Sequence, residues 1–102
     1  MLKKEKVKFI LGVILFGFAV RVSHADISQR QARTLLQSGQ ILSLENIHQK
    51  AHLIQPGRII ESELEKKGKR YIYEVEILDS NGVVWELKLD AKSGELIEIE
   101  ED

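Results

Sequence analysis

The spacing of hydrophobic side chains changes once between residue 26 and the end of the chain. Up to residue 57 apolar residues recur every three or four positions, and from residue 58 they alternate with charged ones. A repeat of 3.6 positions indicates a helix with one buried face, whereas a repeat of two indicates a strand. The sequence therefore predicts a helix over residues 26–39, a second from Ser43 to the Pro56-Gly57 pair, and strands at about 58–65, 70–79, 83–90 and 95–100.

Both predicted helices carry suitable residues at their ends. Ser28 and Gln31 form a capping box at the start of the first helix, and Gly39 is typical of a helix end. The second helix presents an apolar stripe that includes Ile47 and Ala51. Helices this short need a partner layer to cover their apolar stripes, so we expect them to pack on the sheet.

The register of the middle hairpin follows from its apolar residues. They fall on one face only if Ile77 lies opposite Trp85 and Val75 opposite Leu87. This pairing leaves a three-residue loop that ends in Gly82, where a positive φ is required. The predicted fold is α+β, with two N-terminal helices packed on one face of a four-stranded antiparallel sheet. In the last strand, Ile99 favours Ile97 over Leu96 as the inward residue.

The same register defines the opposite face of the hairpin. Glu74 falls opposite Lys88 and Glu76 opposite Glu86, so these charges point away from the helices. Apolar residues lie among them, and such a mixed strip is a candidate for contact with a partner as well as an ordinary sheet surface. The candidate partner surface consists of Ile72, Glu74, Glu76, Leu78, Val84 and Glu86.

Residues 1–25 have the three-part order of a secretory signal peptide. A basic start is followed by an apolar run over residues 9–20 and by small residues that precede a cleavage site after Ala25. An uncleaved N-terminal anchor is the alternative, and both place the domain of residues 26–102 outside the cytoplasm. We expect a periplasmic or secreted protein that meets the membrane only through the transient signal peptide.

Charge and composition exclude several classes of function. Residues 1–25 contain five Lys or Arg and one Glu, so ten basic and fifteen acidic residues remain in the predicted domain. This acidic balance argues against nucleic acid as a partner, because phosphate binding needs clustered basic residues. The chain has no Cys, which excludes disulfides and thiolate metal sites.

Catalytic and metal-binding chemistry has little support in the sequence. There is no G-x-S-x-G nucleophile motif and no glycine-rich phosphate loop, so we predict no catalytic residues and no cofactor. His48 and His52 are four residues apart on a predicted helix, with Glu45 one turn earlier, and are weak candidates for a metal site. A zinc site needs three or four converging ligands. We therefore predict a half-buried His48, a solvated His52 and no bound metal.

Residues 26–102 resemble a small, single-copy PepSY domain protein. The most specific matches are Tyr73-Glu74-Val75-Glu76, Trp85-Glu86-Leu87 and the turn Asp90-Ala91-Lys92-Ser93-Gly94-Glu95. Two residues depart from the family pattern: Ser62 replaces an apolar strand residue, and His48 replaces the usual Leu of the helix stripe.

The resemblance implies a function without catalytic residues. PepSY domains occur in the propeptides of secreted metallopeptidases and also alone or in tandem outside the cytoplasm. By analogy, we expect a non-enzymatic binding module that regulates or inhibits a cell-envelope peptidase through protein–protein contact by its sheet face or an edge strand. The alternative is a sensory accessory domain that binds a ligand or metal for an envelope two-component system.

Overall fold

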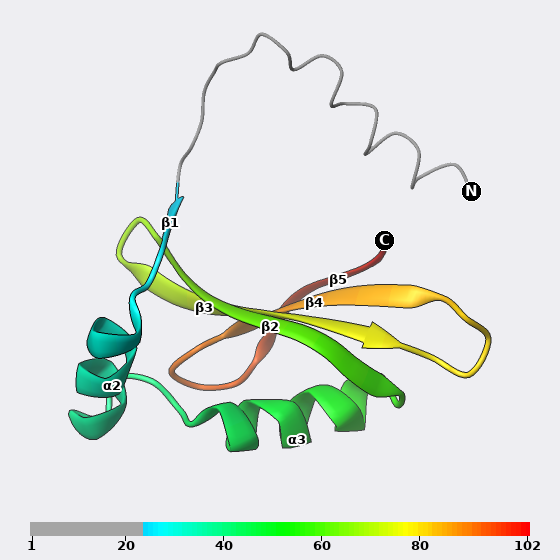
Figure 1. Cartoon of the computed structure of the whole chain (residues 1–102), viewed down its shortest axis with the longest axis horizontal. Coiled ribbons are helices and arrows are strands. Elements are labelled where there is room, and N and C mark those ends of the chain that lie inside the picture. The colour runs from blue at the N-terminus through cyan, green and yellow to red at the C-terminus, as the bar shows by residue number, and fades with distance from the viewer. Residues whose placement is uncertain (1–23) are drawn as a thin grey trace, which may run out of the picture.

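The computed structural model describes residues 24–102, so the predicted signal peptide lies outside the described residues except for its last two positions. These residues form one five-stranded antiparallel sheet with the strands in sequence order (Figure 1). Its elements are β1 (His24–Asp26), α2 (Gln29–Gln37), α3 (Leu44–Ile54), β2 (Arg58–Lys67), β3 (Arg70–Leu78), β4 (Val84–Asp90) and β5 (Leu96–Glu101). Within this part of the chain, no helix has the length and apolar character needed to cross a membrane.

The helices begin at the predicted caps. The Ser28 hydroxyl accepts a hydrogen bond from the Gln31 amide at 3.1 Å, and the Ser43 hydroxyl accepts one from the Asn46 amide at the same distance. Each bond satisfies an amide that has no partner within the helix. The second helix ends at Ile54, and its cap residue Gln55 lies directly before the proline.

The middle hairpin has the predicted register. Ile77 pairs with Trp85 and Val75 with Leu87, and Gly82 has a φ of 82° in the loop. The Asp79 carboxylate closes this loop by accepting bonds from two backbone amides and from the Trp85 indole Nε1, the last at 2.8 Å.

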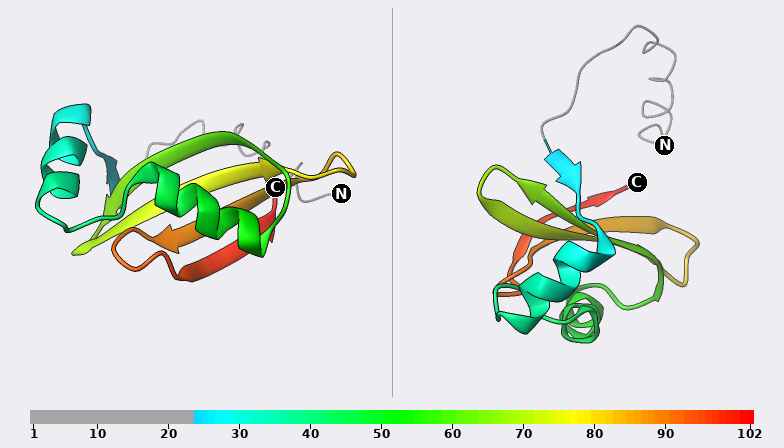
Figure 2. Two further views of the ribbon diagram at one scale, coloured as in Figure 1. Left: turned by 90° about the horizontal axis from the view of Figure 1, so that it is seen from below. Right: turned by 60° about the vertical axis from the view of Figure 1, so that its left-hand side comes forward.

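Both helices lie on the same face of the sheet, and the hydrophobic core lies between the helices and that face (Figure 2). Tyr73 joins the two layers, because its hydroxyl donates a 3.0 Å hydrogen bond to the Leu42 carbonyl oxygen. The predicted α+β fold with helices on one sheet face is confirmed. The largest fully buried side chains are Ile47, Val75, Ile77, Leu87 and Leu89.

The structure differs from the sequence prediction at two places in the sheet. The short strand β1 adds a fifth strand, which pairs with one end of β2. In β5, a register shift, or bulge, places Leu96 opposite Leu89 and Ile99 opposite Leu87, while Leu96 and Ile97 are about equally exposed, at 40% and 38%. The preference for Ile97 over Leu96 as the inward residue stays a prediction. The bulge lets two residues three positions apart lie opposite inward-facing residues, which a strict repeat of two does not allow.

Candidate functional site

The predicted partner surface lies on the sheet face opposite the helices. Its glutamates pair as predicted, with Glu74 opposite Lys88 and Glu76 opposite Glu86. Leu78 and Val84 pair at the end of the same hairpin, and all of these residues are partly buried. Ile72 contributes almost no surface, since it is only 5% exposed.

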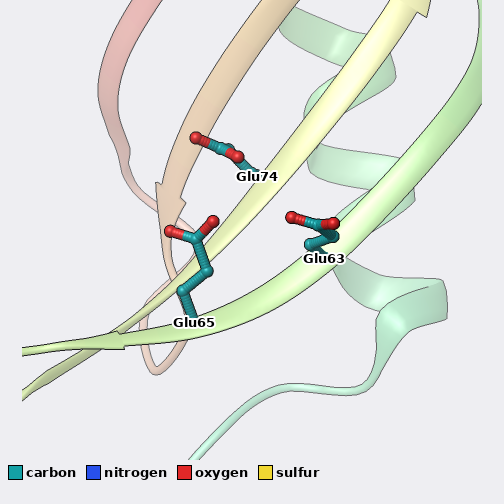
Figure 3. Close-up of side chains that lie close together, drawn as sticks. All are labelled: Glu63, Glu65 and Glu74. Carbon is teal, nitrogen blue, oxygen red and sulfur yellow. The ribbon is translucent and has the colours of Figure 1, made fainter. Parts of the chain in front are cut away.

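Strand β2 extends this face with three further glutamates. Glu61 lies opposite Glu76, Glu63 opposite Glu74 and Glu65 opposite Ile72. The carboxylates of Glu63, Glu65 and Glu74 converge from two strands, with oxygens within 4.8 Å of one another (Figure 3). Carboxylates grouped in this way can share protons or bind a hard cation.

The alternation of glutamates in β2 is the signal that sequence reasoning missed. The register of the β2–β3 pair determines which strand residues share the face, and our prediction worked out only the register of the β3–β4 hairpin. We call the complete set the acidic face. It consists of Glu61, Glu63, Glu65, Glu74, Glu76, Glu86, Glu98 and Glu100.

Burial and mutual repulsion raise the pKa values of three glutamates on the acidic face. Partial burial and the negative charge of Glu74 raise the pKa of Glu86 to about 7. Burial raises the pKa of Glu74, and the negative charge of Glu65 and a hydrogen bond between the two side chains raise it further. Burial and the charge of Glu61 also raise the pKa of Glu76. The face is therefore partly protonated near neutral pH.

Lys88 offsets part of this charge from the middle of the sheet. Its Nζ lies 3.8 Å from a carboxylate oxygen of Glu74 and 3.8 Å from one of Glu98. Lys88 thus links β3, β4 and β5 across the acidic face.

The two departures from the family pattern contact each other. His48 Nε2 of α3 and the Ser62 hydroxyl of β2 are 2.7 Å apart, within a partly buried contact between helix and sheet. Burial, followed by the nearby charge of His52, lowers the pKa of His48. The imidazole is therefore neutral at neutral pH and shares a hydrogen bond with the Ser62 hydroxyl, in which the imidazole tautomer determines the donor.

The histidine pair does not form a cluster of metal ligands with Glu45. Within residues 24–102, the one group of at least three potential ligands is that of Glu63, Glu65 and Glu74. His48 is partly buried and contacts Ser62, while His52 and Glu45 are exposed. A Ser–His pair also resembles part of a hydrolase triad, but among residues 24–102 His52 is the charged neighbour that acts on His48, and it is not a carboxylate.

An apolar groove of about 560 Å³ lies between α2 and β2. Ser62 and Leu64 of β2 form one wall and Tyr73 is also part of the lining, while Leu36 and Leu44 of the two helices form the other wall. Leu36 and Leu44 are 44% and 43% exposed, so they present apolar surface to the groove. The spacing of apolar residues in the two helices gives no sign of this groove.

Comparison with known proteins identifies the family. Residues 36–100 match the family model described as the peptidase propeptide and YPEB domain, PepSY. No curated protein and no solved structure matches the chain. Because the matched segment spans α3 and strands β2 to β4 completely and covers more than half of the sequence, the chain belongs to the PepSY family.

Proposed function

We propose that this chain is an exported, non-enzymatic binding module that regulates or inhibits a cell-envelope peptidase through protein–protein contact. Membership of a family described by peptidase propeptides supports a peptidase as the partner. PepSY domains are typically non-catalytic modules, which supports binding as the mode of action. The signal-peptide pattern of residues 1–25 supports export.

The acidic face is the observation that carries the proposal. Burial and the charges of neighbouring glutamates raise the pKa values of Glu74, Glu76 and Glu86. A basic partner surface would relieve this repulsion, exclude water and favour the charged carboxylates. Binding should therefore release protons and strengthen as the pH rises from about 6 to 8, since Glu86 has a pKa of about 7.

A proteolysis assay with secreted and envelope metallopeptidases tests the proposal. The purified protein should change the cleavage rate of at least one of them, and the effect should weaken with salt. The double variant Glu76→Gln/Glu86→Gln should lower the affinity about tenfold or more. Glu45→Gln on the helix side removes one exposed carboxylate outside the face and should leave the affinity unchanged. An unchanged rate for every peptidase, together with no peptidase captured from intact envelopes, would overturn the proposal.

A further inference from the structure

The outer side of β2 is open along most of its length. β1 pairs only with Glu65, Lys66 and Lys67, and the chain then turns away into α2 (Figure 2). The last contact is a 3.4 Å hydrogen bond from the Ile27 amide to the Leu64 carbonyl oxygen. Among the residues that the structure describes, no strand pairs with residues 58–63 on this side.

The hydrogen bond at Leu64 also indicates which backbone groups face the open edge. Backbone groups of alternate residues point to the same side of a strand. Because the Leu64 carbonyl oxygen faces Ile27, the amide and carbonyl of Ser62 point to the same open side. Such groups can pair with an added strand.

The apolar groove lies directly beside this open edge. Ser62 and Leu64 line it, and their side chains are on the face that carries the helices, as shown by their pairing with Val75 and Tyr73. The side chain of an added residue opposite Ser62 would point into the groove. Its volume of about 560 Å³ falls within the range of pockets that bind ligands.

Charge distinguishes the two faces of such an added strand. Its residues on either side of the apolar one would point to the opposite face, beside Glu61 and Glu63. Arg33 and Glu63 both border the groove, so its charges are balanced, while most of the remaining lining is apolar and suits an apolar side chain. Lysine or arginine is therefore favoured at the outward positions, and an apolar residue is favoured at the inward one.

We infer that β2 and the apolar groove form a peptide-binding site for an extended segment with an apolar residue between two basic residues. The segment adds to β2 antiparallel, as β1 does. Backbone hydrogen bonds to Ser62 hold it, its apolar side chain enters the groove, and its basic side chains lie beside Glu61 and Glu63. The inference rests on the proposed function as a protein-binding module and identifies the chemistry of the segment that it binds.

Labelled synthetic peptides test the site with the unmodified protein. The probe is acetyl-Lys-Leu-Lys-Val-Lys-amide, and fluorescence anisotropy measures its binding. In an antiparallel pair, the residue opposite Ser62 directs its amide to β2, and the residue two positions along the probe points its amide to the same side. N-methylation of the Leu and Val amides should therefore abolish binding, whereas N-methylation of the Lys amides should change it less than twofold. A probe with Glu in place of Lys should bind at least tenfold more weakly.

Protein variants locate the site on the groove. Leu44→Lys places a charge in the groove and should weaken binding at least tenfold, while Leu53→Lys changes an 86% exposed residue on the same helix and should have no effect. Absence of probe binding, or equal effects of the two N-methylation patterns, would overturn the inference. If the protein inhibits a peptidase but binds no probe, only the inferred peptide-binding site is refuted. If it binds the probe but affects no peptidase, only the proposed function is refuted.

Discussion

Replacing His48 by Leu and Ser62 by Val, singly and together, tests how the helix-to-sheet contact is stabilised. Each single change leaves a polar group without its partner in a partly buried site, where the loss costs about 1 to 3 kcal/mol. Partial solvent access places both single variants near the lower end, at about 1 kcal/mol each. The double variant restores the usual apolar contact and should be as stable as the unmodified protein. The coupling free energy is then about 2 kcal/mol.

Urea unfolding monitored by circular dichroism measures this cycle. A loss of about 1 kcal/mol lowers the midpoint by about 0.5 to 1 M for a domain of this size. The single variants should therefore unfold at visibly lower urea concentrations, and the double variant should not. If the double variant loses the sum of the two single effects, the His48–Ser62 hydrogen bond does not couple the two positions and the reasoning is refuted.

The pH dependence of the same variants gives a second reading. Burial lowers the pKa of His48 in the folded protein, so the unfolded state binds its proton first as the pH falls. The stabilising effect of neutral His48 is present above the unfolded value of about 6.5 and is lost below it. This loss should be absent from the double variant. Subtracting the stability-versus-pH profile of the double variant from that of the unmodified protein removes the effect of the glutamates, which both proteins share.

Two further predictions concern the acidic face and a close backbone approach. The pKa of Glu86 rises from 4.5 to about 7, so its stabilising effect is present below pH 4.5 and is lost as the pH rises through 7. The full shift corresponds to about 3.4 kcal/mol, which solvent screening reduces to about 1 kcal/mol. Glu86→Gln should therefore raise the melting temperature at pH 8 by about 4 to 8 °C relative to the unmodified protein, and equal shifts at pH 5 and pH 8 would contradict this. In Gly57→Ala, the added Cβ would lie 2.5 Å from a backbone carbonyl oxygen at the end of β3, with a φ of 148°. Gly57→Ala should lower the free energy of unfolding, measured in urea, by about 2 to 5 kcal/mol. The control Gly68→Ala, at a φ of 66° with no atom near the added Cβ, should lower it by about 1 to 2 kcal/mol. Equal losses in the two variants would exclude the close approach as the cause.

The elements that the sequence predicted correctly are those specified by nearby residues. Ser28 and Ser43 cap the helices through amides three positions away, and Gly82 determines the hairpin loop. The hydrophobic alternation then determines the β3–β4 register, because a shift by one residue would expose its apolar face. These features need no knowledge of distant contacts.

The features that sequence reasoning missed depend on residues that are far apart in the chain. The strand β1 pairs with β2 some forty positions later, and the register shift in β5 changes which of its residues lie opposite the apolar residues of β4. The contact of His48 with Ser62 joins two positions that each looked unfavourable when considered alone. The apolar groove likewise arises only when α2, α3 and β2 are placed together.

The indole that Asp79 holds gives the protein a built-in optical reporter. Trp85 is the single tryptophan of the chain, and it packs against the core at the hairpin end of the sheet while donating its Nε1 hydrogen to that carboxylate. Its emission should shift when the core opens and water reaches the ring. Trp85 does not line the apolar groove, so a peptide bound there should leave the emission spectrum nearly unchanged. One spectrum can thus separate loss of the fold from occupation of the groove without any added label on the protein.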